Sequence, residues 1–154
     1  MQQVIVQKFG GTSVGSGERI AAVAEIIKNE AEMNTVVVVV SAMAGETDRL
    51  IELSKLFGDN PNKREFDALI STGEKVSASL LALALNSLGL KAKSYSAAQV
   101  SLKTTSNFSK AKILDIDKAK MEEILADGSI PIITGFQGIT ETGEVTTLGR
   151  GGSD

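Results

Sequence analysis

A run of five valines, Val36 to Val40, limits the possible folds of this chain more than any other feature. β-Branched side chains favour strands, and an uninterrupted apolar run is typical of a strand that is covered on both faces. Strands of that kind occur mainly in parallel sheets, whose two faces are covered by helices. We therefore predict an α/β fold with Val36–Val40 as a fully buried strand.

Strand and helix patterns alternate along the rest of the chain. Apolar segments predict further strands at 4–9, 91–96, 111–116, 130–136 and 145–148. Helical spacing predicts helices at 18–32, 65–71, 74–88 and 117–127. A further helix is predicted to begin with Thr47 or Asp48 as its cap and to end at about 57. Gly89 and Gly128 are predicted to end the helices at 74–88 and 117–127. Residues 58–64 are interpreted as a linker, and 98–110 receive no assignment.

This order of elements predicts a three-layer αβα domain with a mainly parallel sheet, to which a late hairpin adds an antiparallel element. Its 154 residues suffice for one domain with a substantial core. Ligands of open α/β sheets bind beyond the carboxyl ends of the strands. The loops at Gly10, Ser41, Gly135 and Gly149 all follow predicted strands, so we expect them to face one crevice.

Charge and hydropathy argue against two classes of partner. The net charge is −3 and there is no basic run, which argues against nucleic acid. No apolar stretch approaches the ~20 residues that span a bilayer, and the N-terminus shows no secretory signal. With no cysteine in the sequence, we expect a cytoplasmic protein.

The chain also has no histidine. The absence of both residue types excludes disulfides, thiol catalysis, histidine-based triads and His/Cys zinc sites. Any chemistry must therefore use Lys, Arg, Asp, Glu, Ser, Thr and backbone N–H groups. Phosphoryl transfer suits this set, because it depends on positioning and charge neutralisation more than on a protein nucleophile.

Two glycine-rich loops are candidate anion sites. The first, Lys8 to Gly15, follows the predicted strand 4–9, and its glycines would let backbone amides approach a phosphate. A tight strand-to-helix turn with a solvated lysine explains it equally well. The second, Gly149 to Asp154, surrounds Arg150 with glycines, and here we favour a ligand loop over a plain turn because arginine can hold a carboxylate or phosphate bidentately.

Two further loops have ordinary structural explanations. Ser41 to Asp48 offers hydroxyl groups but is adequately explained as a turn with a helix cap. Ser71 to Glu74 is typical of a helix start with a glutamate in its first turn. The functional alternative for Glu74 is that it receives a ligand ammonium group.

Together the two glycine-rich motifs resemble aspartate kinases, which have the amino acid kinase fold, and not acetylglutamate, glutamate or uridylate kinases. Supporting stretches follow in the same order along the whole chain, at 38–43, 71–74 and 135–138. The resemblance implies that 1–154 is the amino-terminal, aspartate-binding portion of a kinase domain, truncated before the nucleotide-binding half and the regulatory ACT domains. It also implies a homo-oligomer.

The implied activity is transfer of the ATP γ-phosphoryl group to the side-chain carboxylate of L-aspartate, giving 4-phospho-L-aspartate on the way to lysine, threonine and methionine. The acceptor carboxylate has an ordinary pKa near ~3.9, so it is already anionic at pH 7 and needs no general base. Mg²⁺ would be held mainly by the nucleotide phosphates. The fragment by itself is expected to be inactive.

The resemblance also assigns roles to residues. Lys8 would neutralise the transferring phosphoryl group, and Asp154 would orient Lys8. The implied nucleotide contacts are Lys8, Phe9, Gly10, Gly11 and Ser13. The implied aspartate contacts are Ser41, Thr47, Glu74, Arg150, Gly151, Gly152 and Ser153. No metal ligand is assigned.

Two segments depart from the resemblance. Residues 44–46 are less polar than in many relatives, and 107–110 lack a His-Gly or similar pair, so neither segment receives a site residue. Two alternatives to an enzyme stay open: a lobe that binds an amino acid or anion without catalysis, and a structural or assembly role.

Overall fold

The computed structural model describes residues 3–149 and 152 of the chain. Its centre is a four-stranded parallel sheet in the order β1-β2-β6-β3. The strands are β1 (Val4–Phe9), β2 (Thr35–Val40), β6 (Ile130–Thr134) and β3 (Ala92–Tyr95). The predicted α/β fold with a parallel sheet is therefore confirmed.

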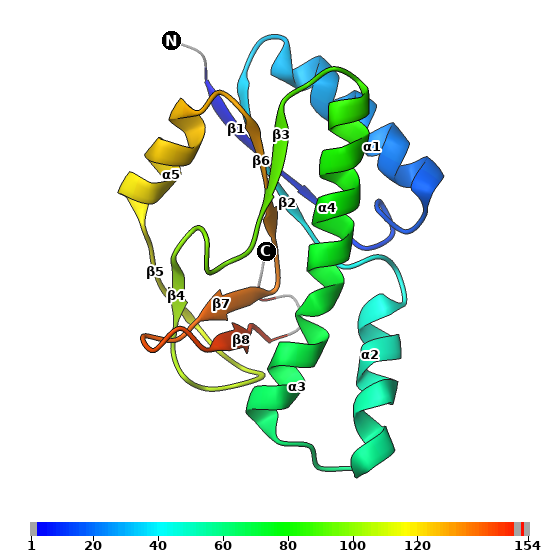
Figure 1. Ribbon diagram of the computed structural model, residues 1–154, viewed down its shortest axis with the longest axis vertical. Coiled ribbons are helices and arrows are strands. Elements are labelled where there is room, and N and C mark those ends of the chain that lie inside the picture. The colour runs from blue at the N-terminus through cyan, green and yellow to red at the C-terminus, as the bar shows by residue number, and fades with distance from the viewer. Residues whose placement is uncertain (1–2, 150–151, 153–154) are drawn as a thin grey trace.

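Helices cover both faces of this sheet, as Figure 1 shows. α1 (Gly17–Ala31) and α4 (Thr72–Ser87) lie on one face, and α5 (Lys118–Ala126) lies on the other. Side chains alternate between the two faces of a strand. In β2, Val38 and Val40 pack with α1 and α4, whereas Val37 packs with α5. The valine run is thus buried from both sides, which is the physical reason for its composition.

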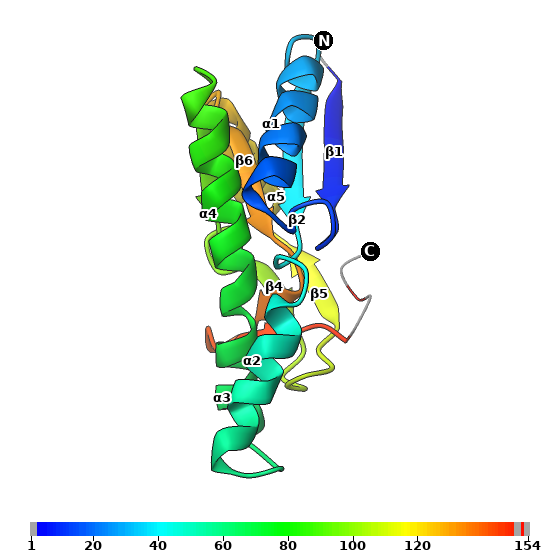
Figure 2. The same ribbon diagram turned by 90° about the vertical axis from the view of Figure 1, so that its right-hand side faces the viewer.

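A second group of elements lies beyond the carboxyl ends of the parallel strands (Figure 2). It contains α2 (Glu46–Ser54), a 3₁₀ turn (Lys55–Phe57) and α3 (Lys63–Ile70). It also contains a small sheet in the order β5-β4-β7-β8, in which only the β4–β7 pair is parallel. Its strands are β5 (Ile113–Ile116), β4 (Leu102–Thr104), β7 (Gln137–Ile139) and β8 (Val145–Thr147).

Two local predictions differ from the structure, and one unassigned segment contains a strand. The predicted cap of α2 is wrong: neither Thr47 nor Asp48 caps the helix, which begins at Glu46 after Gly45 in a left-handed conformation with no side-chain cap. The predicted strand at 130–136 ends at Thr134, because the chain turns at Phe136 and continues as β7. The unassigned segment 98–110 contains β4, which has only three residues and pairs with the next strand, β5, and with the more distant β7. Gly89 and Gly128 do follow the ends of α4 and α5, both with positive φ, as predicted.

α3 and α4 follow one another so closely that Lys63–Ser87 forms one helical stretch of 25 residues. By length and composition alone this stretch could cross a membrane, but half of its most apolar window is buried inside the fold. That burial is typical of the core helix of a globular domain. Leu81 and Leu85 of α4 are completely buried in the main core.

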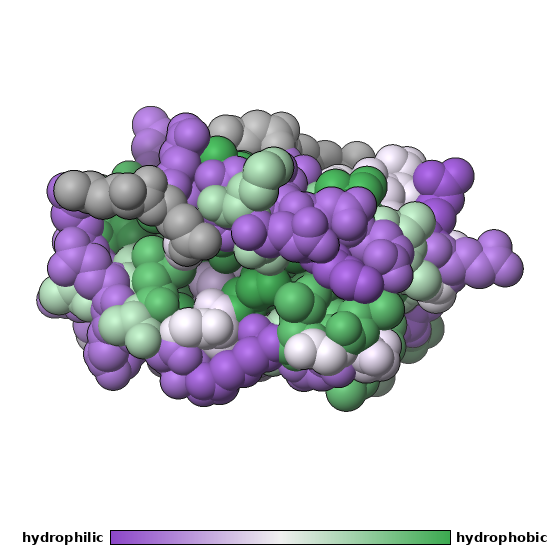
Figure 3. Space-filling view, turned by 90° about the horizontal axis from the view of Figure 1, so that it is seen from above, coloured by the Kyte–Doolittle hydropathy of each residue, from purple (hydrophilic) through white to green (hydrophobic). Residues whose placement is uncertain are grey.

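Hydrophobic residues also reach the surface. Seen from the end at which β1 begins, apolar side chains lie among polar ones (Figure 3). On α4, Val76, Leu80 and Leu83 are exposed at helical spacing and so form one stripe. On the edge strand β1, Val4 and Val6 are exposed, and because Val6 is in register with Val37 they lie on the same face of the sheet as α5.

Candidate functional site

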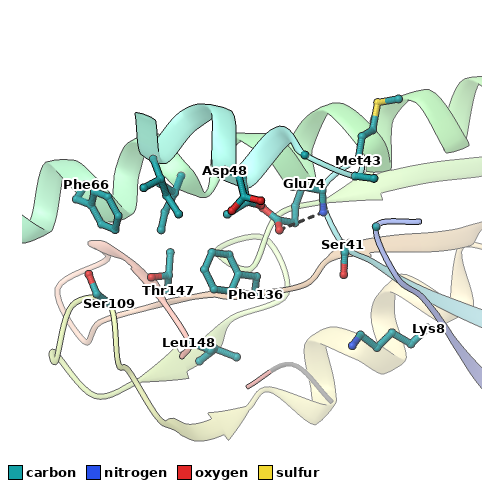
Figure 4. Close-up of a pocket in the computed structure, with 17 residues that line it drawn as sticks. Lys8, Ser41, Met43, Asp48, Phe66, Glu74, Ser109, Phe136, Thr147 and Leu148 are labelled. Carbon is teal, nitrogen blue, oxygen red and sulfur yellow. Dashed lines mark hydrogen bonds between the residues drawn. The ribbon is translucent and has the colours of Figure 1, made fainter. Parts of the chain in front are cut away.

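A pocket of about 610 Å³ lies where the parallel strands end, and its lining includes residues of α2, α3 and the small sheet. Figure 4 shows the side chains that point into it. It is lined by Lys8, Gly11, Ser41, Ala42, Met43, Ala44, Gly45, Thr47, Asp48, Ile51, Phe66, Ile70, Glu74, Ser109, Phe136, Thr147 and Leu148. These residues come from the end of β1, from the loops after β1, β2 and β6, from α2, α3 and α4, and from Ser109 and the end of β8. Three of the four predicted loops therefore border one cavity, and the fourth, at Gly149, follows the lining residue Leu148.

Glu74, in the first turn of α4, is the electrostatic centre of the pocket. Its side chain is almost fully buried, and Oε1 accepts a hydrogen bond from the Ala42 N–H at 3.2 Å. Oε2 is buried without a hydrogen-bond partner among the described residues. Burial raises the pKa of Glu74 to about 7, and hydrogen bonds from backbone N–H groups limit that rise. A buried carboxylate with an unused oxygen is suited to bind a cation or a donor.

The loop after β2 reaches Glu74 because its neighbours are small. A Cβ on Gly11 would lie 2.9 Å from the Ala42 carbonyl oxygen, and a Cβ on Gly73 would lie 2.8 Å from the Ala42 side chain. The Ser77 hydroxyl of α4 also donates to the Ser41 carbonyl at 2.6 Å. Close packing of glycine on both sides therefore places Ser41 and Ala42 at the start of α4.

Lys8 enters the same pocket from β1 (Figure 4). It lies on the exposed face of that edge strand, in register with Val39 of β2. The pocket thus brings together a lysine and a buried carboxyl group, from segments far apart in the sequence. This arrangement suits a ligand that carries both an anionic and a cationic group.

The other residues of the first glycine-rich loop lie further from the cavity. Phe9 packs against the main core and not into the pocket. The N–H groups of Ser13 and Val14 both donate to the Gly10 carbonyl, at 3.0 and 3.3 Å, so these two amides close the turn. Of the loop residues assigned from the sequence, Lys8 and Gly11 line the pocket, whereas Phe9, Gly10 and Ser13 do not.

The assigned aspartate contacts divide in the same way. Ser41, Thr47 and Glu74 line the pocket. Arg150, Gly151, Ser153 and Asp154 lie outside the described residues. Gly152 is exposed and its N–H donates to the Gly149 carbonyl at 2.7 Å. Because Leu148 lines the pocket, the segment that carries Arg150 starts at the pocket wall.

Several pocket residues were missed by sequence reasoning. Phe136 and Ser109 both line the pocket with positive φ, 67° and 66°, a backbone conformation that is rare for side chains of these kinds. Such strain is common at binding sites, where the surrounding structure fixes it. No sequence pattern signals it, because neither residue is glycine, asparagine or aspartate. Asp48, interpreted from the sequence as a helix cap, also lines the pocket.

Residues 3–149 and 152 contain no group of three or more His, Cys, Asp or Glu side chains placed to hold a metal ion. Among the described lining residues, the polar groups are one lysine, two acidic side chains, hydroxyl groups and backbone N–H groups, and they lie beside apolar side chains such as Phe66 and Phe136. A ligand there would be recognised by hydrogen bonds and charge.

This fold and pocket define an α/β domain that presents a polar ligand site at the carboxyl edge of a parallel sheet. The sequence matches the amino acid kinase family over residues 3–154, and the chain belongs to that family.

Individual relatives identify a narrower group of similar proteins within this family. The chain is 53% identical over 152 residues both to an aspartokinase of Geobacillus stearothermophilus and to an aspartate kinase of Pseudomonas putida. Each alignment covers 98% of this chain but 37% of the relative, so the chain spans little more than a third of their length. The resemblance to aspartate kinases predicted from the sequence is confirmed.

Solved structures agree with these relatives. An aspartate kinase from Synechocystis superimposes with a TM-score of 0.82 at 47% identity, over 97% of this chain and 24% of that chain. Aspartokinase III of E. coli, in complex with aspartate and ADP, superimposes with a TM-score of 0.79 at 25% identity, over 99% of this chain and 44% of that chain.

Proposed function

We propose that this chain is the amino-terminal, aspartate-binding portion of an aspartate kinase. The observation that carries the proposal is the 53% identity to two aspartate kinases across nearly the whole chain. The proposed reaction transfers the γ-phosphoryl group of ATP to the side-chain carboxylate of L-aspartate. A carboxylate oxygen forms the new P–O bond, the bond to the β-phosphate oxygen breaks, and ADP leaves with 4-phospho-L-aspartate as the product. This is the first step toward lysine, threonine and methionine.

The pocket supports a role for Glu74 in binding the α-ammonium group. Its Oε2 atom is buried without a partner among the described residues, and an ammonium group is a donor that would satisfy it. Ser41 and Thr47 line the same wall and supply hydroxyl groups for the substrate. Arg150, with Gly151, Gly152 and Ser153, would hold a substrate carboxylate, as the family resemblance implies.

Lys8 is proposed to neutralise charge on the transferring phosphoryl group, with Asp154 orienting it. Its position on the pocket wall supports this role, because a point charge is effective where negative charge develops. Phe9, Gly10, Gly11 and Ser13 would adjoin the ATP phosphates. Mg²⁺ would enter with ATP and be held mainly by phosphate oxygens, which it prefers together with water.

The nucleotide-binding half and the regulatory domains are proposed to lie in the rest of the full-length protein. We place that protein in the cytoplasm, as a homo-oligomer.

The test is an assay of the intact protein that contains this chain, with ATP, Mg²⁺ and L-aspartate. Hydroxylamine converts an acyl phosphate into a hydroxamate, which is measured by its iron complex, and ADP release is followed in parallel. We expect equal amounts of hydroxamate and ADP. Absence of hydroxamate with aspartate, while another amino acid supports it, would contradict the proposed substrate.

Succinate is the matched control substrate, since it keeps both carboxylates and lacks the α-ammonium group. It would leave the buried Glu74 carboxylate unpaired, so we expect it to be a much poorer acceptor than aspartate. In the Glu74→Gln variant the preference for aspartate over succinate should shrink. An unchanged preference would show that Glu74 does not bind the ammonium group.

A further inference from the structure

Asp67 of α3 is an acidic side chain with no exposed surface and no part in the proposed reaction. Each of its carboxylate oxygens accepts two hydrogen bonds. Oδ2 accepts from the N–H groups of Ser109 and Thr147, at 2.8 and 2.7 Å. Oδ1 accepts from the hydroxyl groups of the same two residues, at 2.8 and 3.0 Å. One side chain therefore satisfies four donors.

Both partners of Asp67 line the pocket. They belong to segments that are 42 and 80 residues from Asp67 in sequence, so one carboxylate joins α3 to a loop and to the end of β8. Ser109 holds a positive φ, which needs support from its surroundings. Thr147 precedes Leu148, the last pocket-lining residue before the segment that carries Arg150.

We propose that Asp67 is a positioning residue, which fixes the pocket wall formed by Ser109 and Thr147 and thereby the shape of the cavity that they line. The proposal rests on the proposed function, in which this cavity binds aspartate. Loss of the Thr147 N–H bond would loosen the backbone two residues before Gly149, where the bonds of the Ala111 N–H to the Thr147 carbonyl and of the Leu148 N–H to the Phe136 carbonyl would remain. Displacement by about 1 Å can cost on the order of 100-fold in a site that depends on orientation.

Graded variants test the role of the hydrogen bonds. Asp67→Asn keeps one oxygen for the two N–H groups, and its NH₂ group can donate to the two hydroxyl oxygens, which accept as well as donate. Asp67→Ser keeps a single short acceptor, and Asp67→Ala leaves all four donors unsatisfied. We expect the KM for aspartate to rise by about 10- to 100-fold in Asp67→Ala, less in Asp67→Ser and little in Asp67→Asn. The KM for ATP should stay within about threefold of wild type in each variant.

Thr104→Val is the matched control. Thr104 is buried in β4 of the same small sheet, and its hydroxyl group pairs with that of Thr146 at 2.5 Å, but it does not line the pocket. This variant should lose stability while the KM for aspartate stays normal. A normal KM in Asp67→Ala and Asp67→Ser, or an equal rise in Thr104→Val, would overturn the proposal.

Hydrogen exchange of the Ser109 and Thr147 amides separates this proposal from the proposed function. Exchange of both amides should accelerate at least about tenfold in Asp67→Ser and Asp67→Ala, and remain near wild type in Asp67→Asn and Thr104→Val. If the intact wild-type protein does not phosphorylate aspartate, the proposed function fails and exchange still reports whether Asp67 positions the wall. If exchange is unchanged in both Asp67→Ser and Asp67→Ala, the positioning role is wrong whatever the activity.

Discussion

At the scale of single residues, burial of the Glu74 carboxyl group disfavours its charged form. Its pKa in the folded protein, about 7, lies above the ordinary value of 4.5. The folded state therefore binds the proton more tightly than the unfolded state. Stability from this group is fully present below pH 4.5 and is lost as the pH rises through 7. Between those limits the free energy of unfolding should fall by about 3 kcal/mol.

Glu74→Gln should remove this pH dependence. The amide oxygen can still accept from the Ala42 N–H, and no charge has to be buried. We expect the variant to be more stable than wild type at pH 8, by up to about 3 kcal/mol, and similar at pH 4.5. Urea unfolding at the two pH values measures this, with Glu122→Gln at an exposed site on α5 as the control. An equal difference at both pH values would show that the carboxyl group does not titrate as described.

Lys8 should affect rate and not stability. Its side chain is exposed on an edge strand, so Lys8→Ala should change the free energy of unfolding by less than about 0.5 kcal/mol. In the intact protein the same change should lower turnover by about 100- to 1,000-fold, the usual cost of losing a group that stabilises developing charge. Steady-state kinetics and thermal unfolding of one preparation provide both numbers. A large loss of stability with near-normal turnover would mean that Lys8 is structural.

At the scale of elements, the site depends on how closely the loop after β1 and the start of α4 approach the loop after β2. Gly11→Ala would place a methyl group 2.9 Å from the Ala42 carbonyl oxygen, a backbone atom that cannot move without shifting the loop after β2. We expect a loss of about 1–3 kcal/mol in unfolding free energy. Gly10→Ala is the matched control in the same loop, because no atom lies within 4 Å of its Cβ position and its φ is not positive. Similar losses in the two variants would contradict this explanation.

At the scale of the whole molecule, exposed apolar surface predicts self-association. Val76, Leu80 and Leu83 form a stripe on α4, and a second copy of this chain would bury it. We expect sedimentation velocity to show a dimer of the 154-residue chain and Leu83→Glu to shift it toward monomer without changing its circular dichroism spectrum. A wild-type monomer at high concentration would contradict this.

The same 154-residue chain should show no kinase activity by itself. It spans 37% of the length of the aspartate kinases that it matches, and a phosphoryl-transfer site needs its charges fixed to well under an ångström or so. The hydroxamate assay checks this, with the intact protein as the positive control. Robust acyl phosphate formation by the 154 residues would show that the chain contains a complete site.

The sequence by itself determined the elements whose information is local. A run of β-branched residues becomes a buried parallel strand because each side chain finds apolar contacts on its own face, and Gly89 and Gly128 end helices because they adopt positive φ freely. The glycine-rich motifs also identified the family correctly. Of the residues they assigned, Lys8, Gly11, Ser41, Thr47 and Glu74 line the pocket.

Only the tertiary structure decided the features that join distant segments. β4 was not predictable because its three residues are too few to show an alternating pattern, so only pairing with β5 and β7 defines it. Asp67 on an otherwise ordinary helix gave no sign that it would be buried. The strained backbone of Phe136 and Ser109 is likewise imposed by neighbours that no local pattern contains. The raised pKa of Glu74 is also decided by tertiary structure. A glutamate in a first helical turn is ordinarily solvated, whereas Glu74 is buried against the Ala42 loop, and this burial raises its pKa.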